Sequence, residues 1–442
     1  MQQRKLIGRI RVSAPQAIAV VLAFAALAAF GAYGAEPATL KMWTRSGTDA
    51  RAAWDALTAK FTEKSGIKVE LFSATTDFEQ RLARALASGD LPDVIINDTS
   101  SLGQFVALGV AAEIDRGSIE GSANISDRTW QGARAFDGKY YAVPFSVHPF
   151  VLFIRRDWRT KLGLPVPKTW ADLQALSRAF AEKDPDGNGK ADTYGLLVLG
   201  SVTRGYASWY LSTYLWQSGG DFVRDAGGGK FRGTLTEPQA ANAVKYVRSF
   251  ICVDKSAQPG AINAVPFDAV AGFRSGQAGI YLTGPWNIAV FDKEPGRDKF
   301  EVVAVPAGPV NADVLAEGDL AYIVKSSNNK AAAKAFVEFL ISSEGQALGM
   351  NPTGSPLVRL AANTKVNASL VFKDPRWDVI QDAYVNHGHY MPNVPNWTAI
   401  RQLTAEGFNK LLANCNDNVE PGLKDLNDRL ERELAKQQVL AK

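Results

Sequence analysis

The chain has 442 residues, of which 46% are hydrophobic, 49 are Lys or Arg and 45 are Asp or Glu. Residues 1–34 contain no acid and four bases, so the rest of the chain is balanced in charge. Without a net positive field, nucleic acids and anionic membranes lose the attraction that would bind them. The length exceeds that of one ordinary core and indicates two lobes.

The first 34 residues have the pattern of a secretory signal peptide. A basic segment precedes an apolar stretch at residues 17–30, and small residues follow at Ala32 and Gly34. The apolar stretch is shorter than the ~20 residues of a membrane span, and no cysteine near the cut offers a lipid anchor. We therefore expect a periplasmic protein with no stable membrane insertion after the signal is removed.

The first part of the mature chain alternates between strand and helix patterns. Strands are expected at residues 40–44, 68–72 and 94–96, with helices at 50–64 and from Asp77 onward. This order predicts an α/β lobe that binds ligands at the carboxyl ends of its strands.

The middle and the end of the chain are richer in helix patterns. Helices are expected from Trp170, after Pro238, at residues 330–340 and through most of the chain beyond 397. Strand patterns lie at residues 302–305 and 321–324. These elements predict a second α/β lobe, with a cleft between the two lobes.

The segment DPDGNGKADTYG, residues 184–195, matches most of a calcium-binding loop. Its candidate ligands, at alternate positions, are Asp184, Asp186, Asn188, Lys190 through its carbonyl, and Asp192. Gly195 stands where such a loop has a bidentate glutamate, so another carboxylate would have to complete the shell. We expect a structural Ca²⁺ here, and the alternative is a polar turn rich in Asp, Asn and Gly.

Several of the ten tryptophans stand at the ends of predicted elements: Trp43, Trp209, Trp286 and Trp397. Aromatic rings in such places can stack on the apolar face of a sugar, although core packing is the alternative. His148 lies between two apolar runs and is a candidate ligand contact or a packing residue. The two cysteines, Cys252 and Cys415, are either bridged or free.

Six segments, in this order, resemble the bacterial extracellular solute-binding protein family 1, the sugar-type periplasmic proteins of ABC importers that include the maltose-binding protein. They are LKMWTRSG, ASGDLPDVIINDTSSLGQFVALGVAAEID, DGKYYAVPFSVHPFVLFIRRDW, PKTWADL, GQAGIYLTGPWN and HYMPNVPNW. The resemblance implies an α/β, two-lobed periplasmic binding protein fold, a type II-like clamp in which hinge segments link two mixed sheets flanked by helices. Lobe 1 would hold residues 35–147 with 303–344, and lobe 2 residues 148–302 with 345–442.

The resemblance also implies a ligand site in the cleft. Trp286 would be the stacking plate, and the other expected contacts are Trp43, Arg45, Asn97, Asp98, Ser100, His148, Tyr206, Trp209 and Trp397. His148 stands where the maltose-type pattern has an acidic contact, and Asn97 where it has an aromatic one. These two departures argue against maltose as the ligand.

The implied function is capture of a sugar or polyol by hinge closure and its delivery to an ABC permease with its ATPase subunits. We expect a monomer that needs no cofactor. No familiar catalytic motif is present, so an enzyme is not expected. Two alternatives stay open. One is a secreted glycosidase; the other is the same clamp binding a polyamine, a metal chelate or a phosphorylated polyol, the last through Arg204, Arg359 or Arg401.

Overall fold

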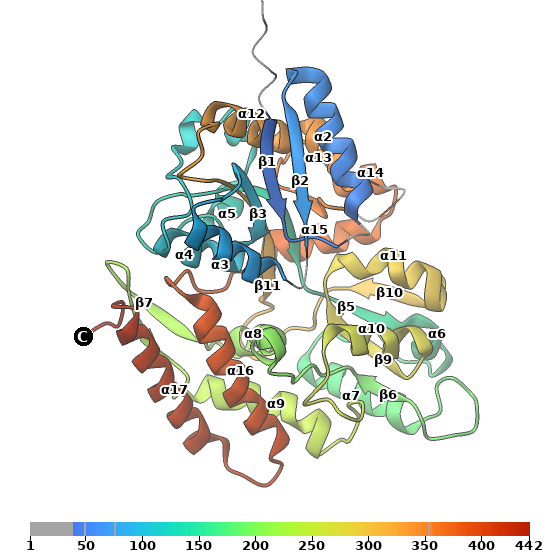
Figure 1. The fold of residues 1–442 in the computed structure, drawn as a ribbon. Coiled ribbons are helices and arrows are strands. Elements are labelled where there is room, and N and C mark those ends of the chain that lie inside the picture. The colour runs from blue at the N-terminus through green and yellow to red at the C-terminus, as the bar shows by residue number, and fades with distance from the viewer. Residues whose placement is uncertain (1–38, 48–49, 75–76, 352–353, 355) are drawn as a thin grey trace, which may run out of the picture.

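The computed structural model describes residues 39–442 apart from 48–49, 75–76, 352–353 and 355. The predicted signal peptide therefore lies outside the described residues. Two sheets, each with its own helices, form the two lobes (Figure 1). No helix in the described part of the chain has the length and apolarity needed to cross a bilayer.

The sheet of the first lobe has seven strands in the order β12-β4-β11-β3-β1-β2, with β13 also paired to β11. The strands are β1 (Thr39–Thr44), β2 (Lys68–Ser73), β3 (Val94–Asp98), β4 (Val143–Pro149), β11 (Val314–Ile323), β12 (Leu360–Ala361) and β13 (Gly388–His389). Strand β1 is parallel to β2 and β3, whereas β11 is antiparallel to β3 and β4. The predicted β-α-β-α-β order of the first lobe is thus confirmed.

The helices of this lobe come from both ends of the described chain. They are α2 (Arg51–Ser65), α3 (Phe78–Ser88), α4 (Leu102–Ala107), α5 (Asp127–Gln131), α12 (Lys330–Ile341), α13 (Ser343–Met350), α14 (Ala368–Phe372) and α15 (Arg376–His387). Helices α12 and α13 both contact α2, so segments far apart in the sequence share one layer (Figure 1).

The second lobe is built on a four-stranded sheet in the order β10-β5-β9-β6, with a separate β7–β8 hairpin. Its strands are β5 (Val151–Arg155), β6 (Tyr194–Leu196), β7 (Val223–Gly227), β8 (Lys230–Gly233), β9 (Ala278–Thr283) and β10 (Phe300–Val303). Its helices are α6 (Arg156–Lys161), α7 (Trp170–Glu182), α8 (Tyr206–Gln217), α9 (Pro238–Cys252), α10 (Pro266–Ser275), α11 (Ile288–Phe291), α16 (Trp397–Ala413) and α17 (Val419–Lys436).

The helix that the sequence predicts from Trp170 has a clear local cause. Thr169 precedes it, and its hydroxyl accepts a hydrogen bond from the Asp172 backbone N–H. The Asp172 carboxylate accepts in return from the Thr169 N–H, which completes a capping box. The sequence signal and the observed start of α7 therefore agree.

Within the described residues, the chain crosses between the lobes three times. The crossings lie between β4 and β5 at residues 149–151, between β10 and β11 at 304–313, and between β13 and α16 at 390–396. The third crossing differs from our expectation, which placed residues 345–442 in the second lobe. Residues 345–389 instead stay with the first lobe, because α13 packs on α2 and β12 pairs with β4. The pairing of β12 across the sheet decides this placement, and no local sequence pattern reports it.

His389 ties the second and third crossings to the second lobe. Its ring stacks on Trp216 of α8, with 4.2 Å between ring centroids. Its nitrogens lie 3.3 Å from a carboxylate oxygen of Asp313 and 3.8 Å from one of Asp221. Burial lowers the pKa of His389, but these two carboxylates outweigh burial and raise it to about 9. The imidazolium therefore forms a charged contact between the crossing segments and the second lobe.

Cys252 and Cys415 form a disulfide within the second lobe. The bond joins the end of α9 to the turn between α16 and α17, and 163 residues separate the two cysteines. A cross-link over so long a loop removes much conformational freedom from the unfolded chain. The structure thus shows that the two cysteines are bridged, which the sequence leaves open.

We expect the double substitution Cys252→Ser with Cys415→Ser to lower the free energy of unfolding by ~2–5 kcal/mol. Chemical denaturation of the variant and of the wild type, each with and without reductant, measures the change. Reductant should bring the wild type to the stability of the variant and leave the variant unchanged. Equal stability of the wild type and the variant in the absence of reductant would contradict this prediction.

Candidate functional site

A cleft of about 590 Å³ lies between the two lobes. Its volume falls in the range of about 300–1,000 Å³ that small-molecule sites occupy. Six of the predicted contacts line it: Arg45, Asp98, His148, Tyr206, Trp209 and Trp286. The charged residues that also line it, which our sequence analysis did not propose as sugar contacts, are Glu317, Asp319, Arg359, Arg274 and Lys293.

Three carboxylates meet where β3, β4 and β11 run side by side. The register places Asp319 of β11 directly opposite Asp98 of β3, and Glu317 opposite His148 of β4. Like charges on opposed strand positions repel each other. Arginines offset this repulsion, because Arg45 forms an ion pair with Asp98, and Arg359 lies 3.2 Å from Asp319.

Glu317 is compensated in a different way. Its side chain is only 3% exposed, and its Oε1 has no hydrogen-bond partner among the described residues. Burial, and then the charge of Asp98, raise the pKa of Glu317 to about 8, although Arg401 and Arg45 act in the opposite direction. Near neutral pH this carboxyl is therefore mostly protonated and can donate a hydrogen bond to a ligand.

His148, beside Glu317, is a neutral group. Burial, and then the charge of Arg359, hold the pKa of His148 well below its ordinary value. Its Nδ1 is buried and has no hydrogen-bond partner among the described residues. A neutral imidazole has one donor and one acceptor nitrogen. His148 and Glu317 thus place two adjacent polar side chains in the lining of the cleft.

The second lobe contributes an aromatic wall. Tyr206 and Trp209 stand in the first turn of α8, with their rings nearly parallel at 6.2 Å between centroids. The ring of Trp286 meets that of His148 edge to face at 5.1 Å. All three aromatic side chains are partly exposed, so each keeps apolar surface for a ligand.

A glycine determines where the Trp286 ring lies. Strand β9 ends at Thr283, and a short 3₁₀ helix, Pro285–Asn287, carries the tryptophan. A Cβ added at Gly284 would lie 1.9 Å from the indole ring, so only glycine lets the ring rest on the backbone. The Asn287 side chain, which donates to the Thr283 hydroxyl at 3.0 Å, fixes the turn.

The structure places four predicted contacts away from the cleft-lining set. Trp43 packs against Phe72 at 5.1 Å between ring centroids, and Asn97 is buried and donates to Ser101. The other two are Ser100, in the short helix after β3, and Trp397, which packs on Phe222 in the core. The periodicity of a strand or helix does not reveal which of its faces meets the other lobe.

The predicted calcium loop is not supported. Among the described residues, no group of three or more His, Cys, Asp or Glu side chains is arranged to hold a metal ion. The loop satisfies its own polar groups: the Asn188 side-chain amide donates to Asp186 and Asp192, and the Asp184 carboxylate accepts three backbone N–H groups. Lys161 donates to the Asp184 carbonyl. The segment is a self-contained polar turn.

A sequence signal for the missed carboxylates does exist. Glu317 and Asp319 interrupt an otherwise apolar strand at positions i and i+2, which places them on one face. Charged residues are rarely buried unless they are paired or functional. Arg359, which we had weighed as a phosphate contact, precedes β12 and needs the pairing of that strand with β4 to reach the cleft.

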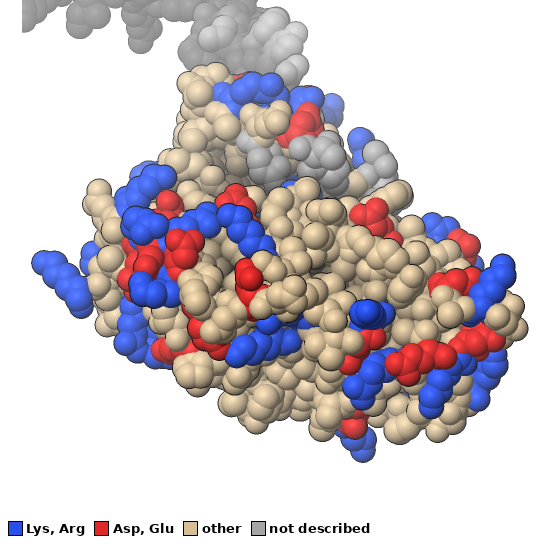
Figure 2. All heavy atoms as spheres, turned by 90° about the horizontal axis from the view of Figure 1, so that it is seen from below, with Lys and Arg blue, Asp and Glu red and all other residues tan. Residues whose placement is uncertain are grey.

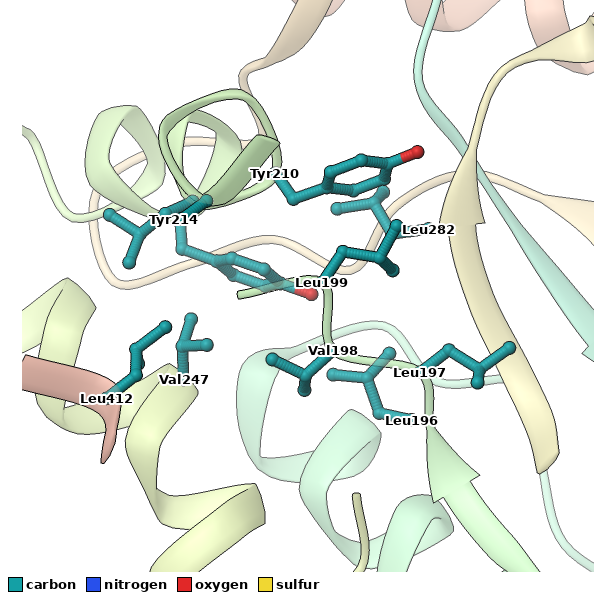
Figure 3. Close-up of a pocket in the computed structure, with 11 residues that line it drawn as sticks. Leu196, Leu197, Val198, Leu199, Tyr210, Tyr214, Val247, Leu282 and Leu412 are labelled. Atoms are coloured by element: carbon teal, nitrogen blue, oxygen red, sulfur yellow. The ribbon is translucent and has the colours of Figure 1, made fainter. Parts of the chain in front are cut away.

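A second cavity, of about 20 Å³, lies behind the aromatic wall in the second lobe. Figure 3 shows the side chains of residues 196–199 facing Tyr210 and Tyr214 of α8 across it. Its volume is about that of one water molecule, and its lining is mainly aliphatic. No sugar ring could enter a cavity of this size.

Two α/β lobes around a cleft that is polar on one side and aromatic on the other define a solute-binding protein. Residues 45–347 match the family model described as bacterial extracellular solute-binding protein. The chain belongs to this family. The resemblance noted in the sequence and the two-lobed α/β fold are thereby confirmed.

Relatives and solved structures agree with this assignment. A maltooligosaccharide ABC transporter solute-binding lipoprotein of Streptococcus pneumoniae is 23% identical over 354 residues, 77% of this chain and 76% of that one. The GacH receptor of Streptomyces glaucescens has a TM-score of 0.76 at 20% identity, over 90% of this chain and 99% of that one. A Thermotoga lettingae solute-binding protein bound to α-D-tagatose has a TM-score of 0.76 at 21% identity, over 90% of this chain and 100% of that one.

The buried Glu317 carboxyl predicts how stability depends on pH. The folded state binds this proton more tightly than the unfolded chain does, whose carboxyl has the ordinary pKa of 4.5. This contribution is therefore present below pH 4.5 and is lost as the pH rises through about 8. The loss approaches about 1.4 kcal/mol for each pH unit between the two pKa values.

Glu317→Gln should remove this contribution, so that the variant gains stability relative to the wild type as the pH rises from 5 to 8. Free energies of unfolding at several pH values measure it, with the exposed Glu182→Gln as the matched control. Parallel pH profiles for the wild type and Glu317→Gln would show that the carboxyl is not held protonated.

Proposed function

We propose that this protein is the carbohydrate-binding component of an ABC importer, which captures a neutral sugar or polyol in the cleft. The observation that carries the proposal is the division of the cleft into a polar wall and an aromatic wall. Sugars have hydroxyl edges and apolar C–H faces, which such walls can bind at the same time. Relatives named for maltooligosaccharide and fructooligosaccharide transport fit this class of ligand.

The charges of the cleft favour a neutral ligand. Asp98 and Asp319 each have an arginine partner, and Glu317 is mostly protonated near neutral pH. A polyamine would require free carboxylates. A phosphorylated polyol would require several uncommitted basic groups, whereas among the described lysines and arginines that line the cleft Arg45, Arg359 and Arg274 are paired, which leaves Lys293, exposed at the rim. Arg401 is half-buried, and the charges of Glu317 and Asp98 act on it electrostatically.

The face of the second lobe that Figure 2 shows gives no support to a polyanionic partner. Figure 2 shows the molecule from the side of the second lobe, where Lys and Arg residues lie interspersed with Asp and Glu residues. A nucleic acid would instead favour an extended positive face. A small ligand bound between the lobes agrees better with this distribution of charge.

Hinge closure is the mechanism that we propose for binding. A ligand that touches both walls has more contacts when the lobes approach, so it shifts the population toward the closed form. The three crossing segments would serve as the hinge. The closed form would then present surfaces of both lobes to the permease, after export to the periplasm under the direction of residues 1–34.

A sugar panel tests this proposal. Thermal shift with mono-, di- and trisaccharides and polyols should show stabilisation by a single class, because a ligand at 100 times its Kd adds ~2.7 kcal/mol. Analysis of the recovered ligand separates binding from hydrolysis. Cleaved product would favour the glycosidase alternative, and a panel without any effect would contradict the proposal.

Trp286→Ala should weaken binding of the identified sugar at least tenfold, or about 1.4 kcal/mol, because it removes the exposed ring from the aromatic wall. Isothermal titration calorimetry measures the affinity. Trp43→Ala is the matched control, since Trp43 packs on Phe72 and does not line the cleft. It should cost stability and leave the affinity close to that of the wild type. Unchanged affinity of Trp286→Ala would rule out the stacking role.

A further inference from the structure

Helix α10 borders the cleft along its length. Pro266 at its first turn and Arg274 at its last turn both line the cleft. Phe267 and Arg274 are seven residues apart, which is nearly two turns, so their side chains leave the helix within about 20° of each other. Phe267 is not itself part of the cleft lining, but it leaves α10 on nearly the same side as Arg274, which is.

Phe267 has no packing role in the described structure. Its side chain is 81% exposed, more than any other large hydrophobic residue described. Single exposed apolar residues are common on protein surfaces. An exposed aromatic ring beside a cleft whose second-lobe wall is already aromatic is better explained by contact with a ligand.

The backbone beneath Phe267 is held in place. Pro266 occupies the first helical position, where its fixed φ suits the helix. The Asp268 carboxylate accepts a hydrogen bond from the Val265 N–H at 3.0 Å. A ring attached to such a fixed turn loses little backbone freedom when a ligand binds, and this favours binding.

The cleft has room for a ligand larger than one ring. Its volume of about 590 Å³ equals that of about 20 water molecules at ~30 Å³ each. Arg274, at the same rim, is already paired with Glu294. An apolar ring face at this rim suits the next ring of an oligosaccharide.

We infer that Phe267 forms an outer subsite that stacks on a second or third ring of an oligosaccharide whose first ring lies in the cleft. This inference rests on the proposed function. It makes oligosaccharides, rather than monosaccharides or polyols, the preferred substrate class. Phe267 then determines how strongly affinity grows with chain length, while the residues deeper in the cleft determine whether a sugar binds at all.

Calorimetric titrations with two series of sugars test the inference: glucose to maltotetraose, and fructose to nystose. In one series the wild type should bind the trisaccharide more tightly than the monosaccharide. Phe267→Ala should bind the trisaccharide about tenfold more weakly than the wild type and bind the monosaccharide equally well. Phe267→Trp should keep or increase the gain with length. Leu370→Ala is the control, since Leu370 is 75% exposed on α14 of the other lobe.

The other outcomes separate the inference from the function. If the wild type binds a sugar and Phe267→Ala matches it at every length, or if affinity does not grow with length, the inference is wrong and the proposed function stands. If the wild type binds neither series, the inference fails, and the wider sugar panel then decides the proposed function. Unfolding midpoints equal to that of the wild type would show that the substitutions leave the fold intact.

Discussion

The position of β11 between β3 and β4 is the constraint on which the cleft depends. The chain enters β11 after its excursion through the second lobe and pairs antiparallel on both sides. That register places Asp319 opposite Asp98 and Glu317 opposite His148. Burying such groups is costly unless they are compensated, and compensation comes from Arg45, from Arg359 and from a bound proton.

This compensation has a consequence for ligand binding. Charges that are already paired do not require a charged ligand, but their oxygens and nitrogens can still form strong hydrogen bonds to hydroxyl groups. Glu317 and His148 also have buried polar atoms without hydrogen-bond partners among the described residues, each of which costs about 1–3 kcal/mol. A ligand hydroxyl that satisfies them would recover part of that cost. The polar wall is thus prepared in advance for a neutral, hydroxyl-rich molecule.

The aromatic wall is prepared by a different physical means. Close contact with Gly284 fixes the Trp286 ring, and the start of α8 fixes Tyr206 and Trp209. The two walls belong to different lobes, so the distance between them depends on the crossing segments. His389, held between Asp313 and Asp221 and stacked on Trp216, ties two of those segments to the second lobe.

The sequence by itself determined the elements whose causes are local. The alternation of the first lobe, the capped start of α7 and the turn that presents Trp286 all depend on neighbouring residues, and the pattern of those residues predicts them. The family motifs extended the prediction to the fold and to six of the residues that line the cleft. Tertiary structure alone decided the rest: the Glu317 and Asp319 carboxylates, the arrival of Arg359, the disulfide, and the burial of Trp397 and Asn97. Each of these depends on strand register or on packing between segments far apart in the chain, and a local pattern carries no information about which distant partner a residue meets.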